Sequence, residues 1–216
     1  MKRGAIFDMD GTLLDTERYF HRAWVDIAEF FGEEKHEQLG FDLSGTNKAQ
    51  VPAILRKYYP NIDVEAYYNK GMEVVREWSE KELLLLPGTK EILEYFKANN
   101  VVMSVASSTK HSTIEAHLQR TEILQYFEVI VGGDEVSSGK PSPEIFLKAA
   151  EKMNLSPQDC YVFEDSFNGI RAGNKAGCAA IMIPNQIQPT EEIINLSAGI
   201  YNSLKEAMKA IELGEI

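Results

Sequence analysis

Two aspartates stand two positions apart near the start of the sequence, in the stretch AIFDMDGTLLDT (residues 5–16). In an extended segment residues i and i+2 point to the same side, so Asp8 and Asp10 can share one site. Two carboxylates at such a short separation repel each other unless a cation or a proton lies between them. Aspartate and glycine also favour solvated turns, so the stretch by itself leaves an ordinary turn open.

A calcium-binding loop of the EF-hand type is excluded by the residues that follow. Such a loop needs glycine at its sixth position and glutamate at its twelfth. Counted from Asp8, these positions hold Leu13 and Tyr19. The acidic pair therefore needs another explanation.

Other polar side chains follow the remaining apolar segments, as Asp8 follows residues 5–7. They are Ser107, Ser108 and Thr109 after residues 101–106, Lys140 in the loop after 127–133, and Glu164 and Asp165 at the end of 160–165. Each of these residues, taken alone, can have an ordinary structural role. Serines and acids cap helix N-termini, and a lysine in a loop is often simply exposed to water.

The stretch SSGKPS around Lys140 has a superficial similarity to a nucleotide-binding P-loop. The match fails because the first glycine of that motif would fall on Asp134 and Pro141 replaces the required serine or threonine. Lys140 therefore belongs with the other polar groups that follow apolar segments.

The elements that must position these groups alternate along the chain. Short apolar, β-branched segments at residues 5–7, 101–106, 127–133, 160–165 and 179–184 are separated by helical patterns. This alternation predicts an α/β fold, a doubly wound parallel sheet with helices on both faces. The carboxyl ends of parallel strands form one edge, where ligands bind. Clustered carboxylates there favour Mg²⁺, and nearby lysine and hydroxyl groups favour phosphate.

Residues 16–83 interrupt the alternation with helical patterns at 16–32, 47–59 and 64–81. In the first of these, apolar residues recur at the spacing of one helix face. Pro87 and Gly88 mark the return to the alternating pattern. We therefore predict a core domain made of residues 1–15 and 84–216 and an inserted α-helical domain of residues 16–83.

Composition narrows the class of protein further. The 216 residues are 44% hydrophobic and carry a formal net charge of −11, which argues against general binding to nucleic acid. No segment reaches the ~20 apolar residues of a membrane span, and no secretory signal is visible. Two cysteines beside apolar residues, Cys160 and Cys178, indicate buried reduced thiols. We expect a cytoplasmic monomer.

Four stretches together resemble the haloacid dehalogenase-like (HAD) hydrolase superfamily and its β-phosphoglucomutase-like branch. They are FDMDGTLLDT (7–16), SVASST (104–109), SSGKPSPEIF (137–146) and VFEDSFNGIRAGNKAG (162–177). They occur in the family's order and span nearly the whole chain. The resemblance implies a Rossmann-like HAD core with an inserted helical cap domain.

The resemblance also implies roles for individual residues. Asp8 would be the nucleophile that forms an aspartyl-phosphate, and Asp10 the general acid and base. The implied phosphate-binding residues are Ser107, Ser108 and Lys140, and the implied Mg²⁺ ligands are Asp8, the Asp10 main-chain carbonyl and Asp165, with Glu164 acting through water. Family members that dehalogenate or pump ions lack an aspartate at the place of Asp10. Its presence favours phosphatase or phosphomutase chemistry.

The choice between these two chemistries rests on the inserted domain. Phe20 stands where the similar mutases carry a histidine, with His21 one position on, and Lys48 stands where they carry a phosphate-binding arginine. Thr16, His21 and Lys48 are the candidate substrate contacts of the cap. We predict an Mg²⁺-dependent phosphatase of small, sugar phosphate-like metabolites. A β-phosphoglucomutase-type phosphomutase and a non-catalytic phospho-ligand sensor remain as alternatives.

Overall fold

The structure is a computed structural model that describes residues 1–43, 46, 50–185 and 188–216. The chain forms two compact units. The core unit contains Met1–Asp15 and Leu84–Ile216, and the helical unit contains Thr16–Leu83. That the helical unit serves as a cap stays a prediction.

The core unit is built on a parallel sheet whose six described strands have the order β3-β2-β1-β4-β5-β6. The strands are β1 (Gly4–Phe7), β2 (Val102–Ala106), β3 (Val129–Val131), β4 (Cys160–Glu164), β5 (Ala179–Met182) and β6 (Gly199–Ile200). β1 lies in the middle, between β2 and β4. The order reverses direction from this central strand, which is the place where ligands bind in open α/β sheets.

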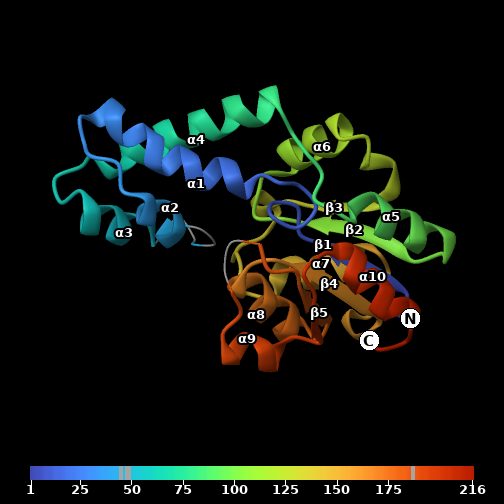
Figure 1. Ribbon diagram of the computed structural model, residues 1–216. Helices are drawn as coiled ribbons and strands as arrows, with labels where there is room; N and C mark the ends of the chain where they lie inside the picture. Colours follow the sequence, from blue (N-terminus) through green and yellow to red (C-terminus); the bar gives the residue numbers. More distant parts are fainter. Residues whose placement is uncertain (44–45, 47–49, 186–187) are drawn as a thin grey trace. The chain divides into compact units, whose positions relative to one another are not determined.

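Helices cover both faces of this sheet (Figure 1). The described helices of the core unit are α5 (Thr89–Ala98), α6 (His111–Arg120), α7 (Glu144–Lys152), α8 (Phe167–Ala176), α9 (Glu191–Leu196) and α10 (Leu204–Glu212). On one face, Phe7 stacks on Phe163 with ring centroids 4.7 Å apart and contacts Phe96 of α5. On the other face, Ile6 and Val162 pack with the apolar residues of α7 and α8. The predicted fold class is confirmed.

Two short elements near the C-terminus were not predicted from the sequence. β6 has two residues and α9 has six, and both are too short to show a recognisable period. β6 extends the sheet by pairing with β5 through Ile181 and Met182.

The segment after β1 is a compact turn. The carbonyl of Met9 accepts hydrogen bonds from the main-chain N–H groups of Leu13 and Leu14, each at 3.0 Å. Gly11 has φ = 77°, a left-handed conformation that glycine adopts without steric cost. The turn is anchored to the returning chain, because Leu13 O accepts from Leu86 N at 2.9 Å and from Thr89 Oγ1 at 3.1 Å.

The helical unit contains α1 (Glu17–Asp26), α2 (Glu37–Leu43), α3 (Val51–Tyr58), α4 (Val64–Lys81) and a 3-10 turn, Ile27–Phe31. α1 and α4 lie side by side (Figure 1). A Cβ on Gly71 would lie 2.2 Å from the Trp24 ring, so a glycine is needed where these helices cross. Tyr67 donates a hydrogen bond to Trp24 O at 2.6 Å inside this apolar core. The helix predicted over 64–81 is confirmed.

Both cysteines are buried and free. Cys160 begins β4, and Cys178 immediately precedes β5. Among the described residues, no helix has the length and apolar character that a membrane span requires.

Candidate active site

Strand register brings Asp8 beside Glu164. Phe7 of β1 pairs with Phe163 of β4, so the next residues along the two parallel strands are neighbours. The hydrogen bond from Asp8 N to Phe163 O, at 2.9 Å, continues this ladder past the end of β1. Because side chains alternate along a strand, Asp8 and Glu164 point to the same face as Ile6 and Val162. Two acids 156 residues apart thus meet at the carboxyl end of the sheet.

Lys140 bridges these two acids. Its ammonium group donates to Asp8 Oδ1 at 2.5 Å and to Glu164 Oε1 at 2.6 Å. A third bond, to Ala106 O at 3.2 Å, joins it to the end of β2. The three side chains are 7%, 9% and 1% exposed for Lys140, Asp8 and Glu164, so the ion pairs are almost completely removed from water.

Burial governs the electrostatics of this cluster. It raises the pKa of Asp8 well above the usual value; the charge of Lys140 opposes this rise, and the charges of Glu164 and Asp10 add to it. Burial acts to lower the pKa of Lys140, but the charges of Asp8 and Glu164 outweigh it and hold that pKa above the usual value. Two buried carboxylates sharing one ammonium group leave an excess of negative charge.

Asp10 is held by hydroxyl groups from the segment after β2. Its Oδ2 accepts from Thr109 Oγ1 at 2.8 Å and from Ser107 Oγ at 3.3 Å. Ser107 Oγ in turn accepts from Thr109 N at 3.2 Å. Thr109 follows the same apolar segment as Ser107, but its contact with a residue 99 positions away has no local signal in the sequence, so the sequence does not predict it as a site residue.

The other predicted site residues of the core unit lie at the same edge of the sheet. Ser108 is exposed, and its main chain packs closely on Gly133, where an added Cβ would lie 2.3 Å from Ser108 O. Asp165 is half-buried and directly follows β4. The structure therefore collects Asp8, Asp10, Ser107, Ser108, Lys140, Glu164 and Asp165 at one end of one sheet.

Glu164 is itself held by residues at the start of α8. Its Oε2 accepts from Ser166 N at 2.8 Å and from Ser166 Oγ at 2.9 Å. Ser166 Oγ also caps the helix by accepting from Gly169 N at 3.0 Å. A Cβ on Gly169 would lie 1.8 Å from the Glu164 carboxyl carbon. Sequence reasoning missed Ser166 and Gly169 as positioning residues.

We expect Gly169→Ala to displace the Glu164 carboxylate and to weaken its bond to Lys140. Overpacking of this kind destabilises a fold by about 1–3 kcal/mol, and catalysis should fall by about 10²-fold if the cluster moves by about 1 Å. Thermal unfolding and steady-state turnover measure the two effects.

Gly173→Ala on the same helix provides the control. Its Cβ would lie 3.1 Å from Val162 Cγ1 and would not meet the Glu164 carboxylate, so turnover should be nearly unchanged. Equal turnover in the two variants would contradict a positioning role for Gly169.

The three candidate cap residues differ in what the structure shows of them. Thr16 is buried, and its carbonyl accepts from Tyr19 N at 2.9 Å at the start of α1. The His21 ring packs on α2, with its centroid 4.2 Å from that of Phe41, and a Cβ on Gly40 would lie 2.8 Å from the same ring. Within the described residues, the buried His21 Nε2 has no hydrogen-bond partner. Lys48 lies outside the described residues.

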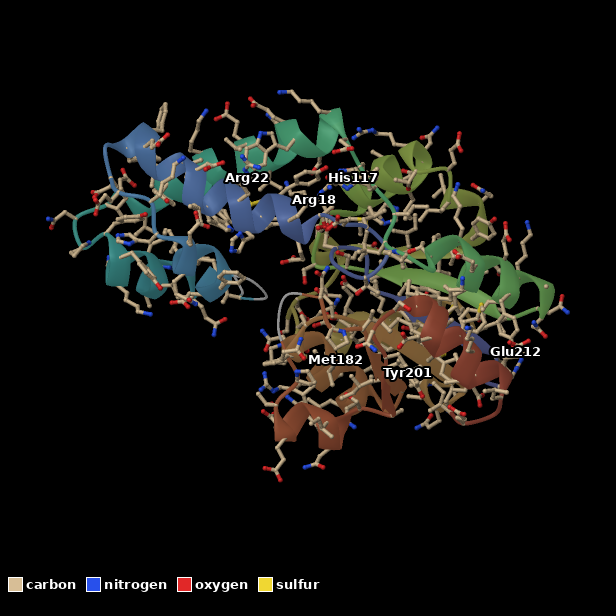
Figure 2. The ribbon with its side chains drawn as sticks, viewed as in Figure 1. Arg18, Arg22, His117, Met182, Tyr201 and Glu212 are labelled. Atoms are coloured by element: carbon tan, nitrogen blue, oxygen red, sulfur yellow. The ribbon has the colours of Figure 1, made fainter. Side chains whose placement is uncertain are left out.

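A histidine that sequence reasoning did not single out lies near Asp10. His117, on α6 (Figure 2), has a buried Nδ1 without a hydrogen-bond partner among the described residues. Burial lowers the pKa of His117, and the negative charge of Asp10 opposes that shift. The neutral imidazole is thus favoured in this position.

The donor set suits a hard divalent cation. The side chains are oxygen donors, and the buried cluster has one negative charge more than Lys140 balances, which a cation would offset. In the described part of the chain, no group of three or more His, Cys, Asp or Glu side chains is arranged to hold a metal. The ligand set implied by the resemblance is not a group of this kind. In it, Asp10 provides its main-chain carbonyl, and Glu164 contacts the ion through a water molecule. The residues fit Mg²⁺.

Comparison with known families defines the class of this protein. The haloacid dehalogenase-like hydrolase family matches residues 5–183. The chain belongs to this family of enzymes.

Individual relatives define the branch. A phosphorylated carbohydrates phosphatase of Thermotoga maritima is 32% identical over 212 residues, which cover 98% of this chain and 91% of the relative. A β-phosphoglucomutase of Bacillus subtilis is 31% identical over 197 residues, 87% of this chain and 85% of the relative. The crystal structure of CbbY from Rhodobacter sphaeroides in complex with phosphate has a TM-score of 0.77 at 25% identity, covering 95% of this chain and 96% of that one. The predicted β-phosphoglucomutase-like branch of the HAD superfamily is confirmed.

Proposed function

We propose that this protein is an Mg²⁺-dependent phosphatase of small, sugar phosphate-like metabolites that works through an aspartyl-phosphate on Asp8. The observation that carries the proposal is the buried bridge of Lys140 between Asp8 and Glu164, with Asp10 held two residues from Asp8. Similarity to a phosphatase of phosphorylated carbohydrates supports the substrate class.

The chain's own residues divide the reaction between them. Asp8 attacks phosphorus in line, and the bond between phosphorus and the leaving oxygen breaks as the Asp8–phosphorus bond forms. Asp10 donates a proton to the leaving oxygen and later takes one from the water that cleaves the acyl phosphate. Lys140, the hydroxyl group of Ser107 and the main chain around Ser108 hold the phosphoryl oxygens.

Asp8, the Asp10 main-chain carbonyl and Asp165 would hold Mg²⁺, with Glu164 contributing through water. When bound, the ion supplies charge that reduces repulsion between the Asp8 carboxylate and an anionic phosphate. Glu164 also orients Lys140 through a direct bond at 2.6 Å.

A phosphomutase is the second candidate, favoured by similarity to a β-phosphoglucomutase. The surroundings of His21 support the phosphatase instead. Its ring is packed between α1 and α2 of the helical unit, against Phe41 and Gly40. In this position it serves the packing of that unit, and Phe20 has no group that could transfer a proton.

A substrate panel tests the proposal. The protein is incubated with Mg²⁺ and a series of sugar phosphates, with and without a sugar bisphosphate, while free phosphate and isomerised sugar phosphate are measured. We expect phosphate release that chelation of Mg²⁺ abolishes and added Mg²⁺ restores. Isomerisation that requires the bisphosphate would favour the mutase. Tight binding without either reaction would indicate a phospho-ligand sensor.

We expect Asp10→Asn to impair turnover according to the leaving group. Sugar alkoxides are poor leaving groups and need the proton, so their turnover should fall by about 10²–10⁴-fold. Aryl phosphates such as p-nitrophenyl phosphate leave without protonation and should lose less in the first step. The measurement is kcat/KM on both substrates, which reports the first step, and equal losses on the two would count against the acid role of Asp10.

A further inference from the structure

The segment after β2, residues 107–111, is bound along its length to the segment 131–135. We call residues 107–111 the phosphate loop, since it carries Ser107 and Ser108 of the proposed site. Three hydrogen bonds join the segments: Ser107 N to Val131 O at 3.1 Å, Gly133 N to Thr109 O at 2.9 Å, and His111 N to Asp134 Oδ1 at 2.9 Å.

Two glycines allow the segments to come this close. A Cβ on Gly132 would lie 2.3 Å from His111 N, and a Cβ on Gly133 would lie 2.3 Å from Ser108 O. Both distances are far below van der Waals contact with main-chain atoms. The phosphate loop therefore takes its position from the segment 131–135.

Glu135 ends this segment and ties it to two helices. Its Oε1 accepts from Gly132 N at 2.9 Å and lies 2.7 Å from His111 Nδ1, at the first residue of α6. Its Oε2 accepts from Lys152 Nζ of α7 at 2.6 Å, and its main-chain carbonyl accepts from Lys148 Nζ at 2.5 Å. One side chain thus connects the residue after β3 with α6 and α7.

The Glu135 carboxylate is charged throughout the neutral range. Partial burial acts to raise its pKa, but hydrogen bonds from Lys152, Gly132 and His111 outweigh this and lower the pKa to about 2. The side chain is 23% exposed, so its contacts are shielded from water in part. Charged hydrogen bonds of this kind are among the stronger ones in proteins.

We propose that Glu135 is a positioning residue for the reaction: through His111 it fixes the phosphate loop and thereby the hydroxyl groups that orient Asp10. The phosphate loop reaches Asp10 through two hydrogen bonds, which Thr109 Oγ1 and Ser107 Oγ donate to Asp10 Oδ2 at 2.8 and 3.3 Å. The proposal rests on the proposed phosphatase function. It assigns Glu135 no contact with substrate.

The contacts of Glu135 allow this role to be separated from a general effect on stability. His111 belongs to the phosphate loop, whereas Lys152 bonds the other carboxylate oxygen and belongs to α7. Loss of either side chain removes one partner of the same acid. A positioning role makes turnover sensitive to His111 and insensitive to Lys152.

The experiment compares Glu135→Gln, His111→Ala, their double variant, and Lys152→Ala. Glu192→Gln is the matched control, since Glu192 pairs with Arg171 of α8 through two bonds of 2.7 and 2.6 Å. Turnover of a sugar phosphate and of p-nitrophenyl phosphate is measured well below the unfolding midpoints. Amide hydrogen exchange of residues 107–111 is followed in parallel.

We expect Glu135→Gln and His111→Ala each to lower kcat/KM on the sugar phosphate by about tenfold, less than the ~10²-fold that a full 1 Å displacement can cause. The loss should be smaller on the aryl phosphate, which does not need a proton from Asp10. The double variant should lose no more than either single variant, because both break one contact. Lys152→Ala and Glu192→Gln should keep wild-type turnover.

Faster hydrogen exchange of residues 107–111 is expected in Glu135→Gln and His111→Ala and not in Glu192→Gln. Unchanged exchange in Glu135→Gln would overturn the proposal, as would equal losses in His111→Ala and Lys152→Ala or equal losses on the two substrates. A wild-type protein that releases phosphate from no phosphomonoester would refute the proposed function instead, and the exchange result would still decide whether Glu135 fixes the loop.

Discussion

Asp8→Asn should abolish Mg²⁺-dependent phosphate release while leaving the protein folded. Loss of a catalytic nucleophile lowers kcat by about 10⁴-fold or more, and the amide nitrogen and oxygen of asparagine cannot form the acyl phosphate. The side chain keeps its size at a position that is 9% exposed. Phosphate release from the best substrate of the panel is the measurement.

We also expect Asp8→Asn to change the stability of the folded protein. The pKa of Asp8 is raised in the folded protein, so this group favours folding at acidic pH and loses that effect as the pH rises through its folded pKa. At neutral pH its charge is unfavourable in the metal-free protein. Asp8→Asn should therefore unfold at the same or a higher temperature than wild type without Mg²⁺.

Added Mg²⁺ should reverse that order, because a ligand that binds the folded state stabilises it and the variant lacks one of the proposed ligands. Asp26→Asn is a matched control, since Asp26 forms partly exposed pairs with Arg22 and Lys35 in the helical unit. Wild-type phosphate release by Asp8→Asn would refute the role of Asp8.

Lys140→Met should reduce both stability and turnover. The variant keeps a long apolar stem but leaves Asp8 and Glu164 buried without the charge that joins them. Breaking a buried ion pair from one side costs about 3–5 kcal/mol. Loss of a preorganised donor to the phosphoryl oxygens lowers kcat by about 10²–10³-fold. Thermal unfolding and turnover measure these effects separately.

A double variant separates the two roles of Lys140. Adding Glu164→Gln removes one of the two unbalanced charges, so Lys140→Met with Glu164→Gln should be more stable than Lys140→Met alone. Turnover should stay low because the phosphate-binding ammonium group is still missing. Lys205→Met is the control, since Lys205 forms a 3.9 Å pair with Glu91 in which both side chains are about half exposed. Near wild-type turnover by Lys140→Met would contradict the proposed phosphate contact.

The sequence predicted the sheet edge well because strand signals are local. Apolar segments of three to seven residues identify the strands, and the residues at or just after the end of each strand must lie at the same edge. This reasoning places Asp8, Ser107 and Glu164 without knowledge of any contact. It failed for β6, whose two residues carry no period.

Contacts across the chain had no such signal. The bond between Lys140 and Asp8 joins residues 132 positions apart, and the bond between Thr109 and Asp10 joins residues 99 positions apart. Gly169 and Glu135 look ordinary in the sequence, since a glycine in a helix and an acid in a loop are common. Their importance comes from the side chains and main-chain atoms that packing brings to them.

The sequence by itself determined the α/β fold, the helical insertion and the chemical character of the site, because residue types and periodicity are properties of short segments. Only the tertiary structure decided how the charges are shared. It is strand register that places Glu164 beside Asp8, and it is the packing of α8 that fixes the Glu164 carboxylate against Ser166. Distances between segments decide whether neighbouring acids repel or share one lysine, and those distances exist only in the folded chain.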